Sequence, residues 1–175
     1  ESAAVDEPLP DGQASMASAL ALARASFAAE GVEAMLADAE TTLALLPVGA
    51  EWYPVASFLV GVACVFTGDH DRAVHAFERA ARYSTSGART GAAFALAQRA
   101  LLAADQGDWI VAEACARESL AIVAQDGIHI FGPGLVTHIA CARVALHAGD
   151  IHEAREHAGR ALDLYRDPSP VALPW

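Results

Sequence analysis

A repeated Gly-Asp dipeptide is the feature that most constrains this chain. It occurs at Gly68-Asp69, Gly107-Asp108 and Gly149-Asp150, with spacings of 39 and 42 residues. Glycine readily adopts the left-handed conformation that ends many helices, and an aspartate after it can cap the next helix by accepting hydrogen bonds from free amides. Each dipeptide therefore predicts a tight turn between two helices, and the fixed period predicts a repeated helical hairpin.

Small residues recur at fixed distances from each glycine. They stand seven and four residues before it and five and twelve after it, which gives Gly61, Cys64, Ala73 and Ala80 in the clearest unit. Small side chains allow two helices to approach closely, so we expect these positions at the contact inside each hairpin, with Phe77 filling the wedge between the helices. A first, degenerate unit has Ala29 at the glycine position and Ala34 at the position of Ala73.

The pattern predicts an all-α fold, an α-solenoid of about four helical hairpins wound as a right-handed superhelix. Residues 1–15 are expected to form a flexible tail or linker, residues 16–167 the repeat domain, and residues 168–175 a Pro-rich end. A polar turn is expected at residues 84–87, and a longer loop with an apolar cluster at residues 127–134. The expected helices are 16–29, 32–46, 52–67, 69–84, 88–106, 108–125, 135–148 and 150–166.

Charge and apolar runs exclude several classes of function. The formal net charge is −11 and the chain contains no lysine, so this segment should repel phosphate backbones and bind no nucleic acid directly. The longest apolar run covers residues 54–66, whereas a helix that spans a bilayer needs roughly 20 residues. The sequence therefore predicts no membrane contact. Three scattered cysteines without a CxxC motif favour a reducing, cytoplasmic location.

No residue pattern indicates catalysis or a cofactor. The histidine pairs His70/His75 and His152/His157 are five residues apart, which places each pair on different helix faces and argues against a metal site. The paired carboxylates fall at expected helix starts or exposed positions, where capping and solvation explain them. The loop at 127–134 lacks the lysine and the preceding strand of a phosphate-binding loop. We therefore predict a protein that is not an enzyme and that needs neither cofactor nor metal.

The recurring positions resemble the tetratricopeptide pattern. The small and aromatic positions of that pattern are occupied here by Gly61, Cys64, Ala73, Phe77 and Ala80. Its Trp and Pro positions are occupied by Ser57 and Thr85, and the period here is longer. Residues 100–123, 142–164 and 172–175 are similar to segments in the sensor repeats of maltose-regulator-like, LuxR-type bacterial transcriptional regulators. In that family an ATPase domain precedes the repeats and a helix-turn-helix follows, so ATP or DNA functions would belong to those parts.

The resemblance implies a non-catalytic sensor region that binds a small-molecule or protein effector in its concave groove. The alternative is a free-standing tetratricopeptide-type scaffold for protein–protein interaction, and self-association into a homo-oligomer is compatible with either. If the first helix of each hairpin lines the concave side, the groove is apolar with few polar groups. Arg143 would bind an anionic group, unless these side chains only pack hairpin on hairpin. The expected binding residues are Phe58, Val62, Phe94, Leu101, Asp105, Ile139, Arg143 and His147.

Overall fold

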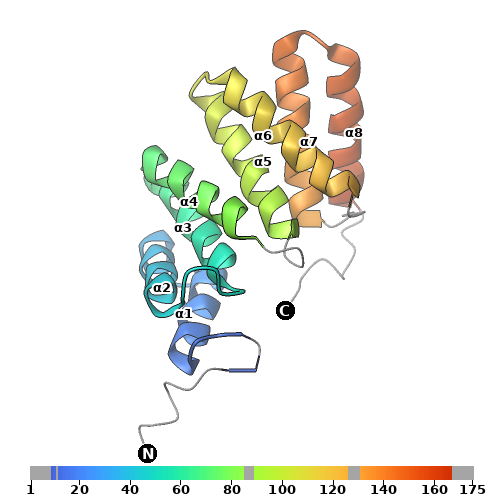
Figure 1. Ribbon diagram of the computed structural model, residues 1–175. Helices are drawn as coiled ribbons and strands as arrows, with labels where there is room; N and C mark the ends of the chain where they lie inside the picture. Colours follow the sequence, from blue (N-terminus) through green and yellow to red (C-terminus); the bar gives the residue numbers. More distant parts are fainter. Residues whose placement is uncertain (1–8, 11, 85–88, 126–130, 167–175) are drawn as a thin grey trace, which may run out of the picture. The chain divides into compact units, whose positions relative to one another are not determined.

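The chain is all-helical in the computed structural model, which describes residues 9–10, 12–84, 89–125 and 131–166 (Figure 1). Within those residues it has eight helices and no strand, which confirms the predicted all-α hairpin repeat. None of the helices there is long and apolar enough to cross a membrane. The helices are α1 (Met16–Phe27), α2 (Val32–Leu45), α3 (Tyr53–Thr67), α4 (His70–Tyr83), α5 (Arg89–Asp105), α6 (Trp109–Gln125), α7 (Phe131–Ala148) and α8 (Ile151–Arg166).

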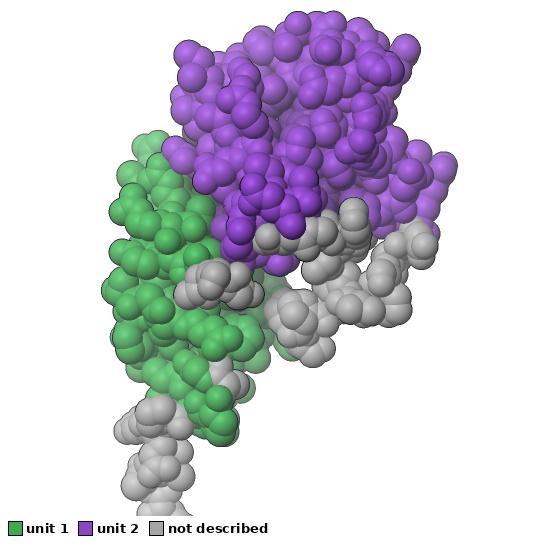
Figure 2. Space-filling model, turned by 45° about the vertical axis from the view of Figure 1, so that its right-hand side comes forward, with its two compact units in different colours: residues 1–88 green, residues 89–175 purple. Residues whose placement is uncertain are grey.

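Two compact units divide the chain, residues 1–88 with α1–α4 and residues 89–175 with α5–α8 (Figure 2). In the second unit, α7 packs against α5, α6 and α8. A buried hydrogen-bond chain joins three of these helices: the Ser119 hydroxyl donates to the Ala93 carbonyl at 2.7 Å and lies 2.7 Å from the Thr137 hydroxyl. In the first unit, α3 packs against α2 and α4 and hardly touches α1.

The three Gly-Asp turns have nearly identical geometry. The glycines have φ of 80°, 81° and 82°. Each following aspartate amide donates to a carbonyl five residues earlier at 2.9 Å, on Cys64, Ala103 and Ala145 respectively. The aspartate carboxylates accept from the amides of Arg72, Val111 and Glu153 at 3.2, 3.1 and 2.9 Å. The predicted combination of a left-handed stop and a carboxylate cap is confirmed in all three hairpins.

The predicted small-residue columns lie in the helix contacts. Phe77 is 1% exposed, and a Cβ atom added to Gly61 would lie 2.5 Å from its Cε1 atom. No real side chain tolerates that separation, so the glycine is required by the aromatic ring of the facing helix. Ala73 and Ala80 are buried beside them, as predicted.

The first hairpin departs from the predicted register. Its turn runs from Ala28, which is left-handed with φ of 46°, to Gly31, which begins α2 without a side-chain cap. The match of Ala34 to Ala73 is wrong by one residue, because Met35 and the residues four and seven after it form the buried face of α2. The turn that replaces Gly-Asp has four residues, 28–31, instead of two, and the buried face of α2 begins one residue later than expected.

The start of α7 was also predicted wrongly. The loop was expected to continue to Gly134, whereas the helix begins at Phe131. Pro133 lies in the first turn, where a backbone amide would lack a helical partner in any case, and its carbonyl accepts the Thr137 hydroxyl at 2.7 Å. The expected apolar residues Ile128 and Ile130, and the turn at 85–87, lie outside the described residues.

The described end of the predicted tail is packed against α1. Gln13 and Ser15 are buried. Ser15 caps α1 by accepting from the Ser18 amide at 3.2 Å, and the Ser18 hydroxyl donates to the Gln13 side chain at 2.9 Å. Residues 1–8, residue 11 and residues 167–175 lie outside the described residues.

Candidate functional site

Arg143 and Asp105, two of the predicted polar groups, form an ion pair at 2.6 Å that joins α7 to α5. The guanidinium expected to bind an anion therefore already has a carboxylate partner. An anionic ligand would have to compete with Asp105 for it. Both side chains remain partly exposed, so the pair is a modest link between two hairpins.

The predicted aromatic residues lie at helix contacts. The Phe58 ring on α3 lies 5.8 Å from the Phe77 ring on α4, centroid to centroid. The Phe94 ring on α5 lies beside Gly132, where an added Cβ would be 3.7 Å from it. Both rings therefore contribute to packing within their own unit. Val62 and Leu101 are half-buried on α3 and α5, and Ile139 on α7 is exposed.

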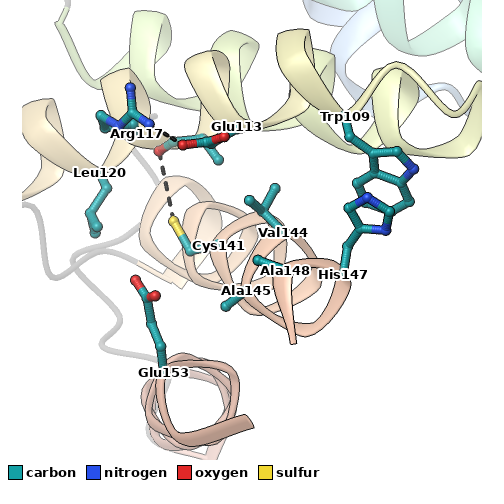
Figure 3. A pocket seen from close by; sticks show the side chains of 11 residues that line it. Trp109, Glu113, Arg117, Leu120, Cys141, Val144, Ala145, His147, Ala148 and Glu153 are labelled. Carbon is teal, nitrogen blue, oxygen red and sulfur yellow. Dashed lines mark hydrogen bonds and ion pairs between the residues drawn. The ribbon is translucent and has the colours of Figure 1, made fainter. Parts of the chain in front are cut away.

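His147 is the predicted residue that lines a pocket. Its ring stacks on the Trp109 indole, with centroids 3.7 Å apart and planes inclined by 7°. The pocket, of about 260 Å³, lies between α6 and α7, with Glu153 of α8 at its edge (Figure 3). Its other lining residues are Glu113, Ala116, Arg117, Leu120, Cys141, Val144, Ala145 and Ala148. Sequence reasoning missed it, because it forms between two hairpins.

The two carboxylates that line the pocket differ in their charge partners. Glu113 is paired with Arg117 one turn along α6. The Glu153 carboxylate is directed from α8 toward the pocket (Figure 3) and lies 3.7 Å from the His157 ring, which is cationic only when protonated. With a neutral His157, Glu153 has no cationic partner among the described residues, and its negative charge lies beside an apolar floor formed by residues such as Val144 and Ala145.

Cys141 lies in the pocket wall with its thiol protonated at neutral pH. Burial, and secondarily the Glu153 carboxylate, raise the pKa of its thiol to about 11. Its Sγ donates to the Ala116 carbonyl at 3.7 Å. A thiol that stays protonated is a weak nucleophile, since the thiolate is the reactive form.

A buried histidine pair lies inside the fourth hairpin. The Nδ1 atoms of His138 and His157 are 3.0 Å apart, so one ring donates to the other. In the third hairpin the equivalent positions are held by Leu96 and Cys115. The pair was missed, although aligning these columns would have revealed two histidines at core positions. The described side chains contain no group of three or more His, Cys, Asp or Glu arranged to hold a metal.

The pocket is thus suited to reversible binding. It combines stacked rings, an apolar floor and a carboxylate, and its one thiol is protonated. No protein-family profile, curated protein or solved structure matches this chain.

Proposed function

We propose that this chain is the effector-binding repeat region of a regulatory protein of the LuxR type, and that a small-molecule effector binds in the pocket between α6 and α7. The pocket carries the proposal, because its Trp109–His147 wall and apolar floor offer the mixed surface typical of ligand sites. The resemblance of residues 100–123 and 142–164 to sensor repeats supports the regulatory role.

The chemistry of the pocket favours a small cationic ligand. Glu153 supplies a carboxylate, while Val144 and Ala145 supply apolar contacts. The net charge of −11 also favours the approach of a cation over that of an anion. We therefore expect a compact molecule with an apolar body and an amine.

Phenethylamine is a suitable probe, with phenethyl alcohol and phenylpropionate as neutral and anionic analogues of similar size. Titrations followed by calorimetry and by indole fluorescence should show the amine binding more tightly than either analogue. Glu153→Gln should reduce the preference for the amine, because it removes the carboxylate charge while keeping the size of the side chain.

A matched pair of variants tests the location. Ala148→Trp places a large ring in the pocket at an exposed position, whereas Ala121→Trp places it on an exposed part of α6 outside the pocket. Binding should be lost in the first variant and retained in the second. Equal binding by both variants, or no binding of any of the three probes to the parent chain, would contradict the proposed pocket.

Two exposed phenylalanines favour the scaffold as a second candidate. Phe27 and Phe66 occupy equivalent positions, two residues before the glycine column, and are 77% and 73% exposed. Side chains of this kind can anchor a peptide. Peptide binding that Phe66→Ala abolishes and Ala148→Trp leaves unchanged would favour the scaffold over the sensor.

In a regulator of this kind, DNA binding belongs to parts of the protein other than the repeat region. Because of its charge, the isolated chain should give no salt-sensitive shift of duplex DNA in a gel at micromolar protein.

A further inference from the structure

The buried His138–His157 pair is connected to the proposed pocket through Glu153. The two rings are 8% and 6% exposed, and their Nδ1 atoms lie 3.0 Å apart. The other ring nitrogen of His157, Nε2, lies 3.7 Å from the carboxylate of Glu153, which lines the pocket (Figure 3). A continuous row of three titratable groups therefore runs from the core of the fourth hairpin to the pocket.

The neutral pair favours one arrangement of its hydrogens. Only one of the two facing Nδ1 atoms carries a hydrogen, because the other must accept it. The Glu153 carboxylate beside Nε2 of His157 favours a hydrogen on that atom. Nδ1 of His157 is then the acceptor, and His138 donates from Nδ1 and has no hydrogen on its own Nε2.

This arrangement can take up one proton and keep its hydrogen bond. A proton that binds at Nε2 of His138 makes that ring a cation. Transfer of the shared Nδ1 hydrogen to His157 then moves the positive charge to the ring beside Glu153, where the carboxylate stabilises it. A second proton would place two N–H groups face to face, so the pair titrates as a unit that holds one positive charge.

The other charged groups on the packed elements have partners of their own or stay neutral. Cys141, one turn from His138 on α7, remains a thiol, because burial and then Glu153 raise its pKa to about 11. His147 on α7 is a second titratable ring in the pocket wall. The ion pairs on these elements are Glu156–Arg160 on α8, Glu113–Arg117 on α6 and Asp105–Arg143 between α5 and α7.

We infer that the His138–His157 pair is a proton-controlled switch for the pocket, because a proton on the pair places a cation beside Glu153 and weakens the binding of a cationic ligand. The inference rests on the proposed function, since it assigns a regulation to the same pocket. With a neutral pair, Glu153 is available to the amine of the ligand. With a protonated pair, His157 competes for that carboxylate. The ligand is therefore released as the pH falls through the range in which histidine ordinarily titrates, about pH 8 to pH 5.

The test compares the affinity of the parent chain for phenethylamine at about pH 8 and about pH 5.5, measured by calorimetry. The amine keeps its proton over this range, as the lysine ammonium does. Acidification should raise the Kd about fivefold, the effect of one partly exposed charge pair. Equal affinity at the two pH values overturns the inference and leaves the proposed function standing. No binding at either pH overturns both.

His138→Leu combined with His157→Cys is the matched variant, because Leu96 and Cys115 hold these positions in the third hairpin. Its Kd should change less than about twofold between the two pH values, since no histidine then faces Glu153. His147→Gln removes the titratable ring of the pocket wall and should retain the fivefold change, whatever its affinity at the higher pH. A change that is lost in His147→Gln and kept in the double variant overturns the inference.

A second measurement uses the parent chain, so it does not depend on how a variant in the core folds. Nuclear magnetic resonance of the histidine rings follows proton uptake by the pair with and without saturating phenethylamine. Bound amine should move this uptake to lower pH by about 0.7 pH unit, the fivefold factor on a logarithmic scale, because two linked binding equilibria affect each other equally. Proton uptake by the pair that is unchanged when the amine is bound overturns the inference.

Discussion

The first and second hairpins carry their large core residue on opposite helices at equivalent positions. In the second hairpin the leading helix α3 supplies Gly61 and its partner supplies the buried Phe77. In the first hairpin the equivalent positions are Leu22 on α1 and Ala39 on α2, both buried. Each hairpin therefore has one large and one small residue at these positions. The large residue lies on the second helix of the second hairpin but on the first helix of the first hairpin. The repeat therefore keeps the combined volume of the two facing residues rather than a residue type at each position.

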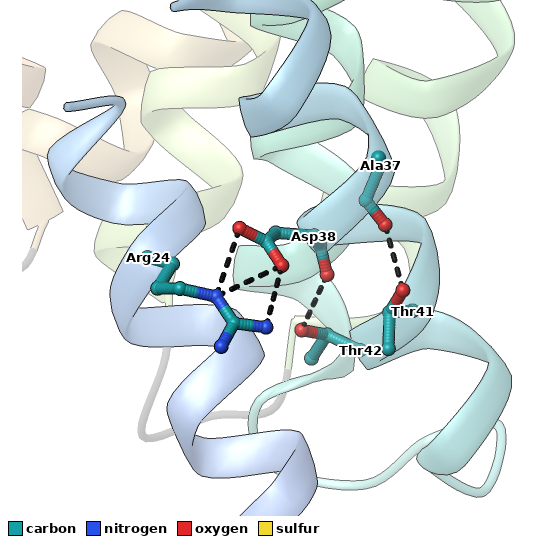
Figure 4. Close-up of polar contacts among 5 residues, drawn as sticks. All are labelled: Arg24, Ala37, Asp38, Thr41 and Thr42. Atoms are coloured by element: carbon teal, nitrogen blue, oxygen red, sulfur yellow. Dashed lines mark hydrogen bonds and ion pairs between the residues drawn. The ribbon is translucent and has the colours of Figure 1, made fainter. Parts of the chain in front are cut away.

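The two hairpins also connect their helices differently. The second uses Gly68 and the Asp69 cap, while the first uses a left-handed Ala28 and has no side-chain cap on α2. An ion pair joins α1 to α2 instead: Arg24 Nε lies 3.1 Å from both carboxylate oxygens of Asp38 and Nη2 lies 2.8 Å from one of them (Figure 4). Asp38 raises the pKa of Arg24, mainly through this hydrogen bonding. Because the pair is solvent-exposed, we expect it to hold the helices less firmly than the turn does.

The largest effect is expected from Phe77→Ala. Removing this fully buried ring should cost about 3–5 kcal/mol in the free energy of unfolding, because a cavity is left in the α3–α4 contact. Urea denaturation followed by circular dichroism would measure the loss. Phe66→Ala, on the exposed face of α3, is the control and should change stability by less than about 0.5 kcal/mol.

Gly61→Leu should cost on the order of 1–3 kcal/mol, because the new side chain collides with Phe77. The double variant with Phe77→Ala recreates the arrangement of the first hairpin, so its loss should be well below the sum of the two single losses. The same denaturation series gives all three values. Additive losses would show that the total volume of the two facing residues does not determine the stability of this hairpin.

The next largest loss of stability is expected from removing a helix cap. Asp69→Ala should lose about 0.5–2 kcal/mol, because the Arg72 amide loses its acceptor. His70→Ala, one position later at an exposed site, serves as control and should have little effect. Thermal unfolding that ranks the two variants in the reverse order would contradict the role of the carboxylate.

Ala28→Gly should stabilise the first hairpin by about 0.5–1 kcal/mol, because glycine adopts the observed positive φ without strain. Ala37→Gly, at an exposed position inside α2, should instead destabilise by a similar amount, about 0.5–1 kcal/mol. The sign of the difference between the two melting temperatures decides the outcome. A loss of stability in Ala28→Gly would show that its left-handed backbone is not a source of strain.

The smallest effect is expected from Arg24→Ala. Its ion pair with Asp38 is exposed, so the melting temperature should fall slightly at low salt. The difference from the parent chain should vanish in about 1 M salt, where charges are screened within roughly 3 Å. A difference that persists at high salt would indicate that the Arg24 stem contributes through packing rather than charge.

Turn chemistry explains which parts of this fold could be predicted. Gly-Asp encodes both a helix end and a cap, so the turns inside the second, third and fourth hairpins were placed correctly from the dipeptide alone. The first hairpin lacks that signal, and the buried face of its second helix was expected one residue too early, at Ala34 instead of Met35. The α7 start was misplaced because Pro133 was interpreted as part of a loop, although the first turn of a helix accepts proline.

The candidate site was harder to predict, because its contacts cross between helices of different hairpins. Of the expected binding residues, His147 lines the pocket, whereas Asp105 and Arg143 pair with each other. Their partners could not be derived, since the Trp109–His147 stack depends on how α6 meets α7. A single-helix periodicity contains no information about that angle.

The cysteines have a practical consequence for studying this chain. Cys64, Cys115 and Cys141 are all buried thiols, with one in each of the second, third and fourth hairpins. Burial, the larger cause for both, raises the thiol pKa of Cys64 and Cys141. A thiol-alkylating reagent therefore reaches Cys64, which is 0% exposed, chiefly when its hairpin opens, whereas Cys141 lines the pocket and can meet a reagent that enters it. Mass-resolved labelling over time would separate the opening rate of the second hairpin from access to the pocket.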